Sequence, residues 1–159
     1  MRTIRTKVYQ FSELSKDAQQ KAIEVMAEIN VDHDWWQSVY EDAANIGLKI
    51  TGFDIDSGSY CKGEFIEDAQ YTGEKILSEH GKICETYKTA SEFIADREKL
   101  DIDEQENELE ELEMEFLNSL LEDYRIMLTK EYEYQTSEAA IIETIEANEY
   151  EFKADGTRF

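Results

Sequence analysis

Proline is absent from this sequence, and cysteine and histidine occur only twice each. Without proline, a long helix meets no residue that would interrupt its hydrogen bonds. Cys61 and Cys84 have no CxxC spacing and no secretory context, so we expect reduced thiols rather than a disulfide. No run of about 18 apolar residues occurs, and the opening MRTIRTKVYQF lacks the apolar stretch of a signal peptide. The sequence therefore predicts a cytoplasmic protein that does not enter a membrane.

Basic residues are also scarce. The chain has 16 lysines and arginines against 38 aspartates and glutamates, which gives a formal net charge of −22. Nucleic acids and anionic membranes repel such a polyanion, so the charge excludes direct binding to either. The charge is uneven, since residues 1–60 carry −4 (6 basic, 10 acidic) and residues 61–159 carry −18 (10 basic, 28 acidic). We expect basic surfaces or cations as partners.

The length of 159 residues, with 41% hydrophobic residues, is enough for one domain with its own core. No Gly/Ser-rich linker and no internal repeat divides the chain. We therefore predict a single domain over residues 1–159, ending in a frayed tail at residues 154–159.

The clearest strand pattern is a hairpin at residues 48–66, with a turn at Ser57-Gly58. The apolar residues change faces along its first strand, and a β-bulge at Gly52 would account for this change. Short strands at residues 7–11 and 149–153 are expected to extend the hairpin into a small antiparallel sheet.

Apolar side chains at helical spacing predict five or six helices packed on that sheet, which gives an α+β fold. Ser12 or Ser15 is expected to cap the first helix. Asp32 or Asp34 is expected to cap the second, where Asp34 and Gln37 have the spacing of a capping box. The stripes run over residues 18–29, 35–46, 68–80, 85–99, 103–133 and 137–145.

Nine of the fifteen residues from 101 to 115, the acidic segment, are aspartate or glutamate. A helix of that length spans roughly 22 Å, with about one carboxylate per 2.5 Å, against about one phosphate charge per 1.7 Å of DNA axis. Like charges three or four residues apart destabilise a helix, and no lysine or arginine lies between Lys99 and Arg125 to offset them. A cationic partner would relieve the repulsion; the alternative is a solvated face that only confers solubility. The predicted partner-binding residues are Asp101, Asp103, Glu104, Glu106, Glu108, Glu110, Glu111, Glu113 and Glu115.

The second half of the same long helix is apolar on one face. Phe116, Leu120, Tyr124 and Leu128 have helical spacing, so this half is expected to lie in the core. The same stripe could instead support a homodimer.

Trp35 and Trp36 would point about 100° apart on a helix, so one narrow stripe does not easily bury both. Packing in the core and exposure for contact are both open interpretations. Together with Tyr60, they are secondary candidates for a binding surface, or for a pocket that sequesters a small ligand.

No catalytic motif occurs in the sequence. GxSxG, P-loop, Rossmann and HExxH patterns are absent, and neither cysteine has a catalytic partner nearby in the chain. His33, between Asp32 and Asp34, is better explained by helix capping than by a metal site, which needs several converging ligands. We therefore expect a protein that is not an enzyme and needs no metal or cofactor. The remaining alternative is a hydrolase whose metal is held by carboxylates from distant residues.

Five stretches of the sequence carry a family resemblance, namely Lys7-Val-Tyr-Gln-Phe-Ser-Glu-Leu-Ser, Asp34-Trp-Trp, Tyr40-Glu-Asp-Ala, Ile46-Gly-Leu-Lys-Ile-Thr-Gly-Phe-Asp-Ile-Asp and Tyr60-Cys-Lys-Gly-Glu-Phe. Together they resemble a family of small acidic proteins of bacteriophages and prophages. The resemblance covers most of the chain, is strongest up to about residue 65 and carries no catalytic residue. It implies an anti-defence context, because small acidic phage proteins are often inhibitors of host defence, including anti-CRISPR proteins and DNA mimics.

The acidic segment and this resemblance together predict a non-enzymatic inhibitor. It would bind a basic, nucleic-acid-binding surface of a host defence protein. Such an association would be steered by electrostatics and would weaken with salt.

Overall fold

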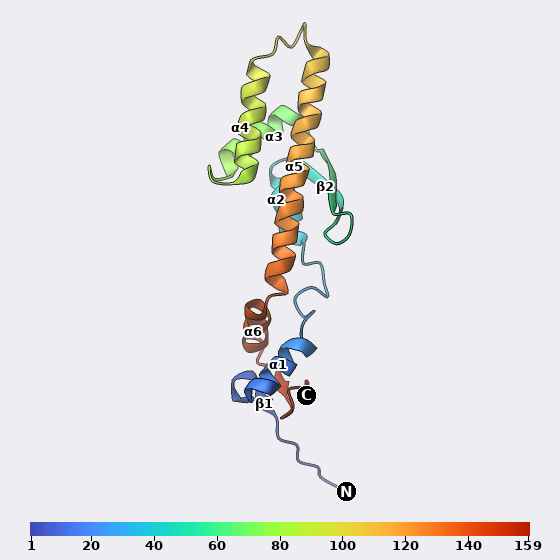
Figure 1. Cartoon of the computed structure of the whole chain (residues 1–159), viewed down its shortest axis with the longest axis vertical. Coiled ribbons are helices and arrows are strands. Elements are labelled where there is room, and N and C mark those ends of the chain that lie inside the picture. The colour runs from blue at the N-terminus through green and yellow to red at the C-terminus, as the bar shows by residue number, and fades with distance from the viewer. The chain divides into compact units, whose positions relative to one another are not determined.

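Six α-helices, one 3₁₀ helix and four strands follow one another along the 159 residues, all of which the computed structural model describes. The strands form two separate antiparallel pairs, β1 with β4 and β2 with β3 (Figure 1). The predicted α+β fold is therefore confirmed. In chain order the elements are β1 (Tyr9–Gln10), η1 (Phe11–Glu13), α1 (Lys16–Val25), α2 (Gln37–Asn45), β2 (Leu48–Asp54), β3 (Tyr60–Phe65), α3 (Ala69–Glu79), α4 (Glu85–Glu98), α5 (Glu106–Gln135), α6 (Glu138–Ala147) and β4 (Glu151–Phe152).

The contacts within the chain gather in two compact units. The first unit contains Met1–Trp35 and Glu131–Phe159, and the second contains Trp36–Lys130. One boundary between them therefore falls inside α5. The single domain predicted over residues 1–159 stays a prediction, which a single unfolding transition of both units would support.

The first unit is built on α1, α6 and the β1–β4 pair. Ser15 and Ser137 cap the two helices, because their hydroxyl oxygens accept hydrogen bonds from the backbone N–H groups of Ala18 (3.2 Å) and Ala140 (3.3 Å). The cap predicted at Ser15 is thus confirmed. The core of this unit consists of Phe11, Leu14, Ala18, Ala22, Ile23, Met26, Ile141, Ile145 and Phe152.

The terminal strands pair with each other and not with the hairpin. Tyr9 lies opposite Phe152, and Gln10 lies opposite Glu151. The predicted extension of the hairpin sheet is therefore wrong, because both termini belong to the first unit and the hairpin belongs to the second.

The residues after β4 form a turn, so the prediction of a frayed tail is also wrong. The N–H of Lys153 donates to the carbonyl of Thr157 at 2.8 Å. Gly156 is buried in this turn with a φ of +89°, and a Cβ there would collide with the carbonyl oxygen of Ala18. Packing against α1 holds the tail in place.

In the second unit, β2 and β3 form the predicted hairpin. Their pairing shifts between Ile50 and Gly52, which leaves Thr51 as the extra residue and confirms a bulge at this point. The bulge explains why the apolar side chains change faces along β2.

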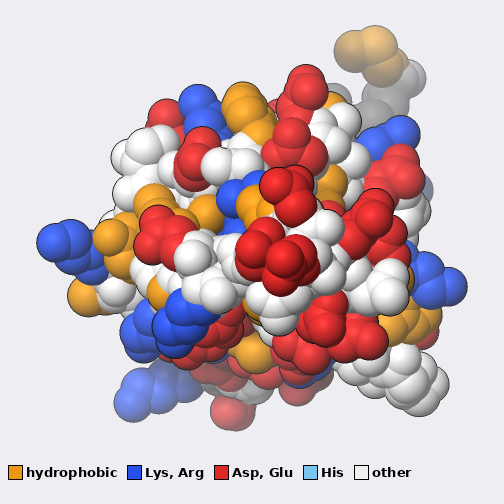
Figure 2. Space-filling model, turned by 90° about the horizontal axis from the view of Figure 1, so that it is seen from above, with side chains coloured by type: hydrophobic (Ala, Val, Ile, Leu, Met, Phe, Trp, Pro, Cys, Tyr) orange, Lys and Arg blue, Asp and Glu red, His pale blue; other side chains and the backbone are white.

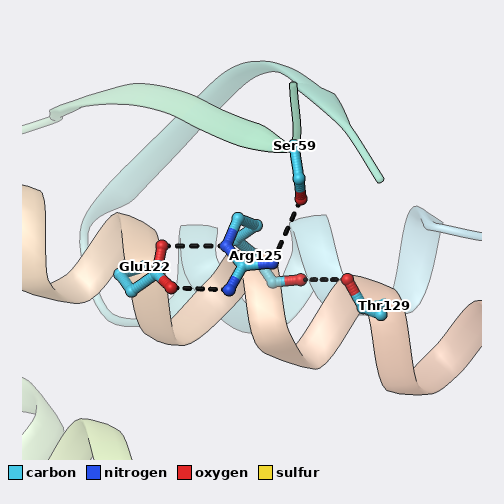
Figure 3. A network of polar contacts seen from close by, with 4 residues as sticks. All are labelled: Ser59, Glu122, Arg125 and Thr129. Carbon is cyan, nitrogen blue, oxygen red and sulfur yellow. Dashed lines mark hydrogen bonds and ion pairs between the residues drawn. The ribbon is translucent and has the colours of Figure 1, made fainter. Parts of the chain in front are cut away.

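Arg125 of α5 connects that helix to the turn of the hairpin (Figure 3). Its Nε and Nη2 donate to the two carboxylate oxygens of Glu122 at 2.8 and 2.6 Å, and its Nη1 donates to Ser59 Oγ at 3.1 Å. The hydroxyl of Thr129 donates to the backbone carbonyl of Arg125 at 3.0 Å. The first basic residue after the acidic segment is therefore already engaged by a carboxylate outside that segment.

The apolar half of α5 lies in the core of the second unit, as predicted. Phe116 stacks on Phe93 of α4 with ring centroids 4.2 Å apart, and α4 and α5 run in opposite directions (Figure 1). Because this stripe is buried within its own chain, it is not exposed as a dimer surface. The buried members of the stripe are Phe116, Leu120, Leu121, Tyr124 and Leu128.

The second helix begins later than predicted. Trp36 occupies the N-cap position without a side-chain cap, so neither Asp32 nor Asp34 caps α2. Trp35 donates its backbone N–H to the carbonyl of His33 at 2.7 Å, which makes a tight turn before the helix. The directions expected for both tryptophans on a helix therefore do not apply.

Candidate functional site

The acidic segment begins with a turn and continues as a helix. The carbonyl of Asp101 accepts the backbone N–H of Gln105 at 2.7 Å, and Gln105 Oε1 accepts the N–H of Asp101 at 3.0 Å. Asp101 Oδ1 also accepts the N–H of Asp103 at 3.2 Å. The prediction that Asp103 and Glu104 lie on the helix is therefore wrong, because these local hydrogen bonds close a turn before α5 begins.

From Glu106 onward the segment is helical. Leu109 and Leu112 are half-buried and Phe116 is buried, so one face of α5 packs inward from its first turns. Glu106 and Glu108 lie in the first turn, where the helix dipole favours negative charge. Glu106 and Glu110 are four residues apart, so the like-charge repulsion predicted for the helix applies to this pair.

The carboxylates of the acidic segment are exposed. Eight of the nine predicted residues are exposed, and Glu113 is half-buried. None of the nine takes part in the six ion pairs of the structure. Figure 2 looks onto the connection between α4 and α5, and acidic side chains, in red, are spread over this face. The segment is thus a dense negative surface that the protein does not neutralise itself.

The basic residues just before the segment do not offset it. Lys99 lies 3.7 Å from Asp96, and Arg97 forms no ion pair and has a buried Nε without a hydrogen-bond partner. The acidic segment is therefore not packed against lysines or arginines of its own chain.

The three secondary candidates each pack against a neighbouring side chain. Trp35 packs on Tyr132 with ring centroids 5.3 Å apart, whereas Trp36 packs on Phe53 at 5.7 Å. Tyr60 is 42% exposed, and Lys62 Nζ lies 4.9 Å from the centre of its ring. Each of the three side chains thus contacts a neighbour within its own unit, and a shared binding surface or pocket stays a prediction.

The two histidines differ in their surroundings. His33 is exposed with its Nδ1 3.2 Å from Asp32, and neither residue belongs to a helix cap. No group of three or more histidine, cysteine, aspartate or glutamate side chains is arranged to hold a metal ion. The structure therefore gives no geometry for the metal-dependent hydrolase that the sequence left open.

His80 belongs to a polar network in the second unit. Its Nδ1 shares a hydrogen bond of 2.6 Å with Thr86 Oγ1, and its Nε2 lies 3.5 Å from Asp42. Tyr124 donates its hydroxyl to Asp42 Oδ2 at 2.8 Å. The hydrogen bond with His80 is the main reason why the pKa of Asp42 is lowered. Burial raises this pKa, and the hydrogen bond from Tyr124 lowers it. The network connects α2, α4 and α5, and Thr86 within it is only 3% exposed.

A pocket of about 410 Å³ lies beside this network, at the α3–α4 turn and the middle of α5. Sequence reasoning missed it. The sequence offered one indication of this pocket, the carboxylate of Asp123. Asp123 follows Leu120 by three residues and precedes Met127 by four, so it lies at the edge of the apolar stripe of α5. The pocket is lined by Asp42, His80, Ile83, Cys84, Glu85, Thr86, Asp123, Ile126, Met127 and Lys130.

No helix of this protein combines the length and the apolar character that crossing a bilayer requires. Comparison with known protein families, with curated proteins and with solved structures finds no match to the chain. The phage and prophage relationship therefore stays a prediction from the sequence resemblance.

Proposed function

We propose that this protein is a non-enzymatic, phage-type inhibitor of host defence. It uses the acidic segment to occupy the basic, nucleic-acid-binding surface of a host protein. The observation that carries this proposal is the set of eight exposed carboxylates at one end of the second unit, none of them in an intramolecular ion pair.

The physical argument begins with the repulsion between these carboxylates. A basic surface that binds the segment lowers this repulsion and adds charge-assisted hydrogen bonds. A site built for a phosphate backbone presents several lysine or arginine side chains, which is the arrangement that a row of carboxylates can engage. The net charge of −22 steers such a partner toward the protein, and salt screens this attraction.

Two variants with the same net charge distinguish an effect of the acidic segment from an effect of net charge alone. In an acidic-segment variant, Glu104, Glu106, Glu108, Glu110 and Glu111 are replaced by lysine, which changes the net charge from −22 to −12. A matched variant carries the same five-lysine change elsewhere, at glutamates that are exposed and form no side-chain hydrogen bond or ion pair. These matched positions are Glu24, Glu28, Glu133, Glu143 and Glu146.

The test is a capture experiment with the immobilised parent, acidic-segment variant and matched variant in bacterial lysate, followed by elution with duplex DNA. We expect the parent and the matched variant to retain the same nucleic-acid-binding proteins, which DNA releases, and the acidic-segment variant to lose them. If both variants retain the same proteins as the parent, or if DNA releases none of them, the segment is a solubilising face and the proposal is wrong.

A further inference from the structure

The pocket beside α5 has the composition of a site for an organic cation. Its volume of about 410 Å³ is within the range of roughly 300–1,000 Å³ typical of small-molecule sites. Ile83, Ile126 and Met127 supply apolar surface, and Ile83 is 90% exposed. All lining residues belong to the second unit, and none belongs to the acidic segment.

The charges around the pocket are mainly negative. Asp42, Glu85 and Asp123 line it, whereas Lys130 is the one lysine or arginine that does so. Two of these carboxylates already have partners, since Asp42 accepts the hydroxyl of Tyr124 and Glu85 lies 3.0 Å from Lys88.

Asp123 is the carboxylate with capacity left. It is half-buried, and its Oδ2 accepts the hydroxyl of Thr89 at 2.7 Å. Its Oδ1 has no hydrogen-bond partner, and the residue forms no ion pair. Burial raises the pKa of Asp123, and Glu85 and Glu122 raise it further against the effect of Thr89. A half-buried carboxylate among like charges is stabilised by an added cation.

We infer that this pocket binds a small organic cation, in which a primary ammonium or guanidinium group contacts Asp123 and an apolar body lies against Ile126 and Met127. This site is independent of the acidic segment and adds a ligand to the proposed protein-binding function. The mixture of apolar walls and one convergent charged group is the usual composition of a selective small-molecule site.

The chain contains its own reporter for occupancy. Cys84 is exposed and lines the pocket, whereas Cys61 is half-buried on β3. Burial raises the pKa of the Cys61 thiol to about 11, so at neutral pH it holds little of the reactive thiolate. Alkylation by iodoacetamide at neutral pH therefore reports mainly on Cys84, and a ligand in the pocket should slow it.

The experiment compares three probes that share a phenyl ring on a two-carbon or one-carbon stem, namely phenethylamine, 2-phenylethanol and phenylacetate, at about 0.15 M salt. We expect phenethylamine to protect Cys84, and the neutral alcohol to need at least about tenfold higher concentration. Ethylamine, which carries the charge without the ring, should not protect. Phenethylguanidine, which carries a guanidinium in place of the amine on the same stem, separates the two cation types, and protection by either cation supports the inference.

Two variants and one control identify the contacts. Asp123→Asn keeps an acceptor for Thr89 and should raise the half-protecting concentration of phenethylamine about 10- to 100-fold. Ile126→Ser should weaken the amine and the alcohol alike. Glu133→Gln, an equal charge change on α5 outside the pocket, should leave protection within about twofold. Circular dichroism and the slow reaction of Cys61 show that each variant is folded.

The inference is overturned if the alcohol or phenylacetate protects Cys84 as well as the amine, if no cation protects it, or if the Asp123→Asn variant binds phenethylamine like the parent. If the Asp123→Asn variant does not fold, the comparison of probes on the parent and the Ile126→Ser variant decides the question. The acidic-segment variant should still bind the amine within a few-fold, which separates a failure here from a failure of the proposed function.

Discussion

The two halves of α5 belong to one helix but have different surroundings. Over residues 106–115 six of the ten side chains are carboxylates without ion pairs, five of them exposed, whereas over residues 116–128 an apolar stripe is buried in the second unit. Isolated helices are marginal in water, and tertiary packing supplies most of the stability of a protein helix. The buried half therefore holds the helix in place, whereas the carboxylates of the exposed half have no ion-pair partner within the chain.

The largest expected effect lies in the buried half. Leu120 is fully buried, so Leu120→Ala should lower the free energy of unfolding by about 2–5 kcal/mol through lost burial and the cavity left behind. Glu110→Ala, ten residues earlier and exposed, should change it by no more than about 0.5 kcal/mol. Urea denaturation measures both. Similar losses for the two variants would show that the exposed half also supports the fold.

The next effect concerns the polar contact that the buried half makes with α2. Tyr124→Phe removes the hydroxyl that donates to Asp42 at 2.8 Å, so we expect a loss of about 1–2 kcal/mol in the same assay. Tyr134→Phe is the matched control, because Tyr134 is 55% exposed and its hydroxyl has no hydrogen-bond partner. Equal effects of the two substitutions would mean that the contact with Asp42 adds nothing to stability.

The pH dependence of stability gives a smaller effect with a defined sign. The pKa of Asp42 is lowered in the folded state, mainly by the hydrogen bond with His80. Its contribution to folding stability is therefore fully present above the unfolded-state pKa of about 3.8, and it is lost as the pH falls through the folded-state pKa. The parent should therefore lose stability relative to Asp42→Asn by up to about 1 kcal/mol as the pH falls from 6 to 2.5.

Asp123 provides the opposite sign in the same titration. Burial raises its pKa, so protonation favours the folded state, and the parent should gain stability relative to Asp123→Asn as the pH falls through the folded value. Urea midpoints measured across this pH range for the parent and both variants test the pair. Differences of the same sign for the two variants would contradict the assigned environments.

The smallest effect is expected from reversing the charges of the exposed half. In the acidic-segment variant, lysines face the remaining Glu113 and Glu115 at favourable helical spacing, but the loss of Glu106 and Glu108 from the first turn opposes the helix dipole. These effects nearly cancel, so the free energy of unfolding should change by less than about 1 kcal/mol. A loss of several kcal/mol would mean that the segment is part of the structural core.

Local sequence signals predicted much of this fold. Ser15 and Ser137 mark helix starts by their capping oxygens, and the change of apolar faces near Gly52 marks the bulge, because each depends on neighbouring residues only. The stripe of α5 was also readable from its spacing. The exposure of the acidic segment follows from the same pattern, since carboxylates surround a narrow apolar face.

The features that depend on distant contacts could not be predicted in this way. The pairing of β1 with β4 joins segments more than 140 residues apart, and the turn around Gly156 is held by packing against Ala18. The network of Asp42, His80, Thr86 and Tyr124 comes from three separate parts of the chain, namely α2, the connection between α3 and α4 with the first turn of α4, and α5. Nothing in the local sequence of any of these segments names its partner.

The most direct test of the central claim is the affinity of a captured partner for the parent, the acidic-segment variant and the matched variant, measured over a range of salt concentrations. The account predicts that the parent binds more weakly as salt rises and that the matched variant stays within about threefold of it. The acidic-segment variant should bind at least about tenfold more weakly at low salt, with a flatter salt dependence. Equal affinities and equal salt dependences for the two variants would contradict the claim, because net charge and not the acidic segment would then determine binding.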